Sequence, residues 1–481
     1  MQAFRLNKII NVFYILIFFS FGIIAISKQN IVWMAIPFGL TLSNLIVIFI
    51  TTKTDQLFWL LLIFIPLSTE INITASLGID FPDELFLVLI TAITIAKMIH
   101  QQLLFRSIFL SPLLVPIAVH LIWIVISAYF STEPILSLKY LLAKIWYIVP
   151  FVFLSPLLLK QQSDWKKLAV CLCIPMLFII IQNLIRFSFY GFEFASIKKT
   201  MAPFFRNHVN YSSMLVCLLP IGWAIWRFTP TNSTFKKPII YFLVIAIIGL
   251  ILSYSRGAWL ALIVGLISIY IFKKKKMAHV IAVSMVLIIF FIASIINNNN
   301  YLKFAPDHDR TIFHSNFSDH LAATISMKDI STAERFHRWI AGIRMIAEKP
   351  IVGFGPNSFY NQYKPYTVAA FKTWVSNNPE HSTVHNYFLL IAVEQGIIGL
   401  IIFLLLLICM FLKAQQLYHQ FQSSFYSNIA IITGVILMMI TIINCTSDMI
   451  ETDKIGGIFW LCAGVLIALT NQLNIERDTL A

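Results

Sequence analysis

The sequence predicts an all-α polytopic membrane protein, a bundle of about 12–14 transmembrane helices with one large, partly helical loop outside the bilayer. Composition is the first reason. Of the 481 residues, 59% are hydrophobic and 12% are charged, and the mean hydropathy is +0.83. A soluble protein has no interior large enough to bury that much apolar surface. The second reason is arrangement, because the apolar residues form successive runs separated by polar connections.

The apolar runs divide the chain into three regions. Residues 1–296 are predicted to form a transmembrane bundle of about eleven spans, residues 297–385 a loop domain, and residues 386–481 the last helices and a short tail. Two runs are shorter than the ~20 residues that a full crossing needs, so re-entrant or broken helices are expected at 56–68 and 83–97. The candidate spans are roughly 9–27, 31–51, 56–68, 83–97, 109–129, 138–159, 168–187, 209–227, 238–255, 257–272, 277–296, 386–412, 427–446 and 455–471.

Charge in the connections predicts the orientation of the bundle. Lys and Arg gather in residues 97–106, 160–167, 227–237 and 273–276, which the positive-inside rule assigns to the cytoplasm. Both termini are then cytoplasmic, and residues 297–385 lie outside. The net charge of +14 is mostly a result of this topology, so it does not indicate nucleic-acid binding.

A helical hairpin is predicted between two basic clusters that both belong on the cytoplasmic side. Residues 238–272 would form a helix of about 52 Å if unbroken, which is far longer than one crossing. The stretch should therefore turn back at the outer face, at the sequence SYSRGAW of residues 253–259. Gly257 is expected to permit the turn. Arg256 is then held at the outer edge of the membrane.

The outer segment 297–385 contains a predicted helix at residues 331–350. Ser331 and Glu334 have the spacing of a capping box, and Pro350 ends the helix. Four residues should form an apolar stripe that lies on the membrane or on the spans, namely Phe336, Ile340, Ile343 and Ala347. Arg335 and Arg338 share another face, as a binding surface or as a solvated face paired with Glu334.

Two other features of the outer segment are a turn and a group of histidines. The sequence GFGPNSF at residues 353–359 predicts the turn. His308, His314 and His320 recur every six residues, which fits no standard zinc motif. Neither a metal site nor a cofactor is therefore expected.

Basic residues also enter the outer ends of the spans, which the positive-inside rule disfavours. Lys139 and Lys144 begin one span, and a second outer loop carries Arg206 and His208. Charge in a membrane is costly and is usually retained for function, so an anion site is expected, with phosphate the anion that arginine suits best. Alternatively, the two lysines extend to the interface as isolated side chains.

The sequence STVHNYFLLIAVEQGIIGL, residues 382–400, places His385 and Asn386 at the start of an apolar run. Histidine titrates near neutral pH, which suits proton transfer. Glu394 lies about 13 Å further along the helix and nearly on the opposite face, so it cannot be the partner of His385 through that helix. Pairing with a neighbouring helix is the only role that the sequence suggests for Glu394.

Together these motifs resemble the O-antigen ligase and O-antigen polymerase superfamily, from about residue 200 to residue 400. The resemblance is carried by FFRNHVNYSSMLVCLLPI, SYSRGAWLALIVG, ERFHRWIAGIRMIAEKPIVGFGPNSF and HSTVHNYFLLIAVEQGIIGL, in that order. It implies a C-type glycosyltransferase fold in the bacterial inner membrane, acting at the periplasmic face. The implied donor is a glycan on undecaprenyl diphosphate. Implied acceptors are lipid A-core for ligases, a second lipid-linked repeat for polymerases, and protein hydroxyls for other relatives.

The resemblance also implies roles for particular residues. Arg256 matches the arginine at the apex of the hairpin, Arg335 the arginine four positions before a tryptophan, and His385 the histidine of an HN motif. These three are expected to be catalytic, in a metal-independent transfer with inversion. Whether Arg335 or Arg338 faces phosphate is open, as is the choice between His381 and His385. Residues expected to bind donor or acceptor are Arg338, Arg206, His208, Lys139, Lys144 and Asn386.

Two alternatives remain at the level of sequence. Nothing separates a ligase from a polymerase, which could also bind a chain-length regulator. A lipid-linked glycan flippase is the alternative from another class. Two features count against it: the sequence shows no internal repeat, and the outer loop is large. The absence of a P-loop motif argues against an ATP-driven pump.

Overall fold

The computed structural model describes residue 20 and residues 53–74, 77–296, 330–368, 376, 378 and 382–480. The chain divides into two compact units, Met1–Phe58 and Trp59–Ala481. Of the first unit, little beyond the start of one helix is described, so the second unit carries all that follows. The predicted spans at 9–27 and 31–51 and the three spaced histidines lie outside the described residues, apart from residue 20.

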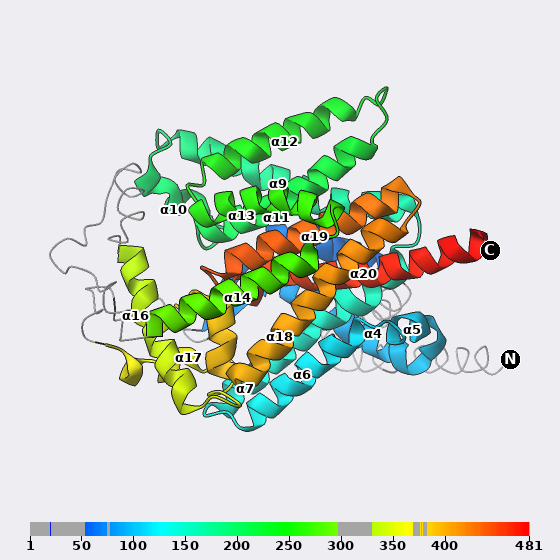
Figure 1. The fold of residues 1–481 in the computed structure, drawn as a ribbon. Helices are drawn as coiled ribbons and strands as arrows, with labels where there is room; N and C mark the ends of the chain where they lie inside the picture. Colours follow the sequence, from blue (N-terminus) through cyan, green and yellow to red (C-terminus); the bar gives the residue numbers. More distant parts are fainter. Residues whose placement is uncertain are drawn as a thin grey trace. The chain divides into compact units, whose positions relative to one another are not determined.

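Helices make up almost all of the second unit (Figure 1). Within the described residues, seven are long and apolar enough to cross a membrane, which confirms the predicted all-α polytopic class. The number of spans stays a prediction, because the described part of the chain does not include residues 21–52. The seven are Pro134–Leu158 (α7, Pro134–Ile148; π-helix η2, Val149–Leu154; α8, Ser155–Leu158), α9 (Gln162–Ser188), α11 (His208–Phe228), α13 (Arg256–Lys273), α18 (Tyr387–Gln420), α19 (Ser424–Asn444) and α20 (Asp453–Leu480, counted to Thr479).

The two short apolar runs have different structures. The run at 83–97 belongs to a broken pair, α4 (Asp83–His100) and α5 (Gln102–Phe109), which bend by 99° where they meet. The broken helix is thus confirmed, and part of the predicted basic connection is itself helical. The run at 56–68 is a single helix, α3 (Thr54–Leu67), without a break. Other shorter apolar helices are α6 (Leu114–Tyr129) and the first part of α14 (Met277–Ile296).

A small antiparallel hairpin, which the sequence did not predict, joins α3 to α4. Its strands are β1 (Thr69–Thr74) and β2 (Leu77–Phe81). The alternation of apolar and polar residues in TEINIT and GIDF is typical of a half-exposed strand. The hairpin was missed because it is short and lies between two apolar runs.

The predicted helical hairpin is present, as α12 (Lys236–Ile251) followed by α13. The prediction for Gly257 is wrong. The turn occupies residues 252–255, and its left-handed residue is Tyr254, with φ +52°. Gly257 is already inside α13, so its backbone freedom is not what the turn uses.

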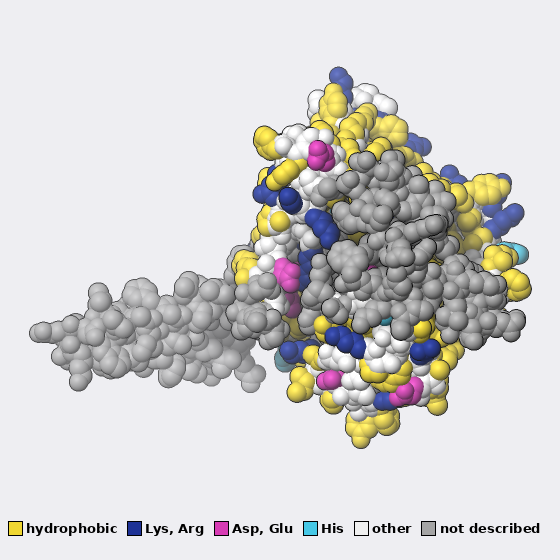
Figure 2. Space-filling view, turned by 90° about the vertical axis from the view of Figure 1, so that its left-hand side faces the viewer, with side chains coloured by type: hydrophobic (Ala, Val, Ile, Leu, Met, Phe, Trp, Pro, Cys, Tyr) yellow, Lys and Arg dark blue, Asp and Glu magenta, His cyan; other side chains and the backbone are white. Residues whose placement is uncertain are grey.

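The irregular segments that matter for function gather at one end of the bundle, here called the loop end. Figure 1 shows α10 (Ile197–Thr200), α16 (Ile330–Glu348) and α17 (Phe359–Gln362) there, with the C-terminus at the other end. The short helices η3 (Phe194–Ser196) and η5 (Lys364–Tyr366) adjoin α10 and α17, and η7 (Met449–Glu451) lies between α19 and α20. Figure 2 views the loop end, where Lys, Arg, Asp and Glu side chains are visible together.

Candidate functional site

His385 is held in a strained conformation just ahead of α18. Its φ is +54°, in the left-handed region that costs a non-glycine residue energy and that clusters at functional sites. Asn386 is the N-cap of α18, with a side-chain oxygen that accepts from the Leu389 N–H at 3.0 Å. The Tyr387 N–H donates to the Ser447 carbonyl at 3.0 Å. These contacts fix the backbone on the C-terminal side of His385.

Helix α16 fixes the backbone on the N-terminal side. The Trp339 Nε1–H donates to the Val384 carbonyl at 3.0 Å, and Arg338 donates to the Thr383 carbonyl at 3.3 Å. Both donors come from one turn of α16. Trp339 of the arginine–tryptophan motif therefore holds the segment that carries His385, together with Arg338 rather than the matched Arg335.

Only part of the predicted apolar stripe of α16 is buried within the protein. Ile340 is buried, but Ile343 and Ala347 are exposed. Gly342 instead approaches Val393 and Leu389 of α18, and Ala341 and Met345 on the neighbouring positions are fully buried. Because Ala341 and Gly342 are small, α16 and α18 can approach each other closely at this point.

Glu334 was predicted to belong to a capping box, but in the structure it makes tertiary contacts instead. Helix α16 begins at Ile330, ahead of Ser331. Glu334 is buried, and its carboxylate accepts from Arg338 at 3.2 Å and from the Ser376 hydroxyl at 2.6 Å. Glu334 therefore holds Arg338 in place.

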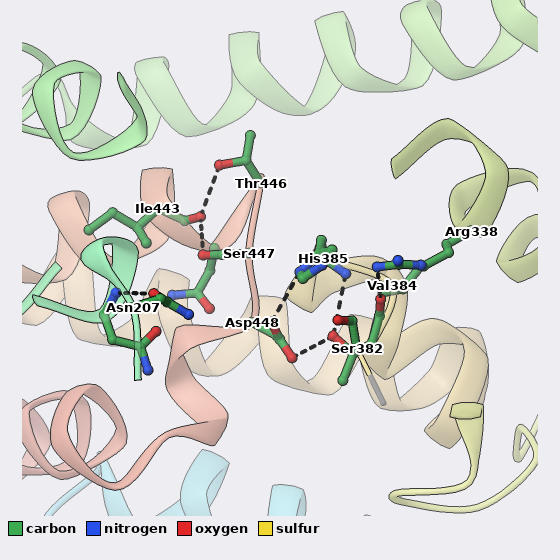
Figure 3. Close-up of polar contacts among 12 residues, drawn as sticks. Asn207, Arg338, Ser382, Val384, His385, Ile443, Thr446, Ser447 and Asp448 are labelled. Atoms are coloured by element: carbon green, nitrogen blue, oxygen red, sulfur yellow. Dashed lines mark hydrogen bonds and ion pairs between the residues drawn. The ribbon is translucent and has the colours of Figure 1, made fainter. Parts of the chain in front are cut away.

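Asp448 faces His385 and is the functional residue that the sequence reasoning missed. Its Oδ1 lies 3.9 Å from His385 Nδ1, and its Oδ2 accepts from the Thr383 hydroxyl at 2.5 Å (Figure 3). The side chain is therefore tied to the same strand of backbone as the histidine. Asp448 follows an apolar run, where an acidic residue gives no signal by itself, and it is distant from His385 in sequence.

The arginines of α16 act on His385 through their charge. Burial is the largest cause that lowers its pKa to about 3, and Arg338 and then Arg335 lower it further. Burial raises the pKa of Asp448, while the charge of Arg338 acts in the other direction. Arg338 is buried and has Glu334 as its partner, whereas Arg335 is half-buried one turn earlier. The imidazole is therefore neutral at neutral pH and can accept a proton.

Arg256 borders the segment that carries Asp448. It is the first residue of α13, and a Cβ added to the next residue, Gly257, would lie 3.5 Å from the Thr446 hydroxyl. The N-terminus of a helix favours negative charge, and a cationic side chain at that terminus adds to the effect. The structure thus brings Arg256, Arg335 and His385 to one end of the bundle.

Other predicted residues of the site have partners of their own. Lys144 is buried and lies 2.9 Å from both Glu451 carboxylate oxygens, one of which also accepts from the Tyr140 hydroxyl. Arg206 pairs with Glu70 at 2.6 Å. Lys139 is exposed on α7. His208 begins α11 directly after its N-cap, Asn207, and Figure 3 shows Asn207 beside Ser447. His381 lies outside the described residues.

Helix α18 is interrupted where the sequence predicted a continuous span. Gly396 has φ +74° and ψ 177°, and a Cβ there would collide with the Ile351 carbonyl. The chain of residues 350–355 runs beside this break. Phe354 and Gly355 donate their N–H groups to the Val393 and Glu394 carbonyls at 3.0 and 2.8 Å, and the Ile397 N–H donates to the Pro350 carbonyl at 2.8 Å. The backbone groups freed by the break are thereby satisfied, as a membrane protein requires.

Glu394 has its role at this break. Its carboxylate is buried and accepts from the Phe359 N–H, at the start of α17, at 3.1 Å. A carboxylate is stabilised by backbone N–H groups that point at it. Glu394 therefore attaches the GFGPNSF turn to α18, which the prediction of helix pairing did not foresee. The sequence signals for this contact were three glycines, Gly353, Gly355 and Gly396. All three adopt a positive φ in the structure, a conformation that favours glycine.

Comparison with known families gives one match. Residues 241–404 match the model of a family described as O-antigen ligase. The predicted resemblance is confirmed over this stretch. It contains Arg256, Arg335, His385 and Glu394, and it ends before Asp448. With the apolar helices, the match indicates a multi-pass membrane glycan transferase of the O-antigen ligase type. A search among curated proteins found no match.

Proposed function

We propose that the protein transfers a glycan from undecaprenyl diphosphate to an acceptor hydroxyl, as an O-antigen ligase-like enzyme of lipopolysaccharide or surface polysaccharide synthesis. The loop end would face the periplasm of a bacterial inner membrane, with both termini in the cytoplasm. The observation that carries the proposal is the cluster of His385 with Asp448 on one side and the α16 arginines on the other. A polymerase of the same superfamily would use the same cluster and another acceptor.

The cluster suits a displacement that needs no metal ion. The acceptor oxygen attacks the anomeric carbon, with inversion, as the bond from that carbon to the diphosphate oxygen breaks. The bonding electrons leave with undecaprenyl diphosphate, and Arg256 and Arg335 stabilise the developing charge. The proton of the acceptor hydroxyl passes to His385. Because Nδ1 faces Asp448, Nε2 is the nitrogen available to accept it.

Donor binding would also tune the histidine. In the unliganded protein, the arginines keep the pKa of His385 low. A bound diphosphate offsets their positive charge, so His385 becomes a stronger base when the donor is in place. The same event draws the anomeric carbon close to the imidazole, which aligns the reacting groups.

The test is glycan transfer by purified protein in detergent, without nucleotide and with EDTA present. The donor is an undecaprenyl-diphosphate glycan, and the acceptors are lipid A-core and a second lipid-linked repeat in separate reactions. We expect release of undecaprenyl diphosphate and a newly linked glycan. His385→Ala and Arg256→Ala should each lower kcat by about 100-fold or more.

Matched controls come from the opposite end of the bundle. His279 of α14 and Arg477 of α20 are both exposed, so His279→Ala and Arg477→Ala should transfer at the wild-type rate. The acceptor that reacts distinguishes ligase from polymerase. Movement of lipid-linked glycan across liposomes, with no product on any acceptor, would contradict the enzyme and favour a flippase.

A further inference from the structure

A polar cleft of about 520 Å³ opens at the loop end, apart from the arginines of α16. Its volume lies in the range of small-ligand sites. Its walls come from the β-hairpin, the segment between α10 and α11, and the turn that leads into α20. The lining residues that the argument uses are Glu70, Asp80, Phe204, Arg206, Glu451 and Asp453.

The hairpin places two carboxylates on one wall. Glu70 of β1 and Asp80 of β2 are direct partners in the antiparallel register, so their side chains lie on the same face. Like charges opposite each other destabilise a hairpin. Arg206 offsets one of them through its ion pair with Glu70 at 2.6 Å, while Asp80 shares a hydrogen bond with the side chain of Asp453, which also lines the cleft.

Glu451 is built rigidly into a second wall. It accepts from Lys144 through both oxygens at 2.9 Å and from Tyr140 at 3.0 Å. Phe204 adds an aromatic surface to the cleft. Carboxylates that accept from hydroxyl groups, beside an aromatic ring that covers apolar C–H groups, are a chemistry that recognises sugars. Because five of the lining residues are carboxylates and three are basic, a phosphate is disfavoured there.

The cleft adjoins the His385 site through one short turn. The Glu451 N–H donates to the Asp448 carbonyl at 3.0 Å, and a turn closed in this way holds its end Cα atoms within about 7 Å. Asp448 faces His385 while Glu451 lines the cleft. In Figure 3, Asp448 and Asn207 lie on one side of His385 and Arg338 lies on the other. Asn207 caps α11, whose residue Asn210 lines the cleft.

From this juxtaposition we infer that the cleft is the subsite for the acceptor glycan, which takes neutral sugars and delivers a hydroxyl to His385 past the Asp448–Glu451 turn. This inference rests on the proposed function, since a displacement with inversion requires acceptor and leaving group on opposite faces of the anomeric carbon. The arginines serve the diphosphate on one side. The carboxylate-lined cleft serves the acceptor on the other.

The first experiment measures binding alone, without a donor. The probes are fluorescent oligosaccharides of two to four sugars, in a neutral hexose series, an N-acetylhexosamine series and a uronic acid series. The protein variants are Asp80→Asn, which keeps the side-chain shape, and Phe204→Ala. We expect a neutral series to bind the wild type more tightly than the uronic acids. Each variant should bind about tenfold more weakly, the effect of losing a hydrogen bond to a charged group or a stacking surface.

The second experiment is the transfer reaction with the same variants. The KM for the acceptor should rise about tenfold, while the KM for the donor stays unchanged. Asp478→Asn, on the exposed end of α20, is the matched control and should change neither constant. Arg256→Ala should bind the neutral probes like the wild type.

The outcomes separate the two proposals. Probe binding that is lost in the cleft variants, in a wild type that transfers no glycan, supports the cleft and contradicts the proposed reaction. Transfer with unchanged acceptor KM in both variants supports the reaction and overturns the cleft. Tighter binding of uronic acids than of neutral sugars also overturns it, because it requires a positive subsite.

Discussion

The His385 site and the polar cleft lie on either side of the Asp448–Glu451 turn, and they differ in the charge that they present. On the first side, Arg335 and Arg338 of α16 accompany the histidine. On the second, carboxylates from the β-hairpin and from η7 dominate. Under the proposed function, this difference in charge would keep the charged leaving group and the uncharged acceptor in separate sites on either side of the turn.

Breaking the ion pair behind the cleft should have the largest effect. Lys144→Met leaves Glu451 without its cation; because Glu451 is partly exposed to the cleft, the cost should approach the lower end of the ~3–5 kcal/mol of a fully buried pair. We expect a large fall in the thermal unfolding temperature in detergent. Adding Glu451→Gln should recover much of it, because no charge is then left unpaired. Equal stability of single and double variants would mean that water or lipid already solvates the pair.

Asp448→Asn tests the residue that joins the two sides. An asparagine keeps the contact with Thr383 but removes the charge that orients the imidazole and stabilises its protonated form. We expect kcat to fall about 100-fold, with the unfolding temperature unchanged. If kcat is retained and acceptor KM rises alone, Asp448 belongs with the cleft rather than with the histidine.

Removing the charge of Glu394 at the helix break should have a smaller effect, which extends to both the His385 site and the polar cleft. Glu394→Gln weakens the hydrogen bond to the Phe359 N–H, which costs about 1–2 kcal/mol. The GFGPNSF turn then loosens from α18. Hydrogen exchange of residues 353–362 should speed up, while Asp478→Asn, on the exposed end of α20, serves as the control for loss of a carboxylate. No change in exchange would contradict the anchoring role.

The pH dependence should show the smallest effect and sharpen the difference in charge. Since burial and the arginines lower the pKa of His385 below its ordinary value of 6.5, the neutral base persists as the pH falls through 6.5. The acidic limb of kcat/KM for the donor should therefore lie below pH 6.5. Arg338→Gln removes one positive charge, so the limb should move to higher pH. A wild-type limb at or above pH 6.5 would contradict an imidazole with a lowered pKa.

Those features that depend on local pattern could be predicted from the sequence. The α12–α13 hairpin was predicted from two lysine clusters that must lie on the same side of the membrane. The position of Arg256 was predicted from the apex of this hairpin. The helix at 331–350 followed from its composition. The buried face of this helix could not be predicted, because the approach of α18 determines that Ala341 and Gly342 are buried. Arg338 is buried only because Glu334 and Thr383 are present as its partners.

Features that depend on contacts between distant segments could not be predicted. Asp448 meets His385 only after α18 and α19 have packed, and no spacing in the sequence connects them. Glu394 looked like a charge within a span, since hydropathy averages over the single residue, Gly396, that breaks the helix. The hairpin of Glu70 and Asp80 was lost between two apolar runs for the same reason.

The break at Gly396 also shortens the part of α18 that can cross the membrane as one helix. Unbroken, the 34 residues of α18 would extend about 51 Å, well beyond a hydrocarbon core of about 30 Å. The part from Ile397 to Gln420 is about 36 Å long, which is close to one crossing with modest tilt. The remaining residues, Tyr387 to Gln395, form a separate short helix directly after His385. Under the proposed function, this helix would hold His385 at the membrane surface, where a lipid-borne phosphate and a water-borne sugar would both reach it.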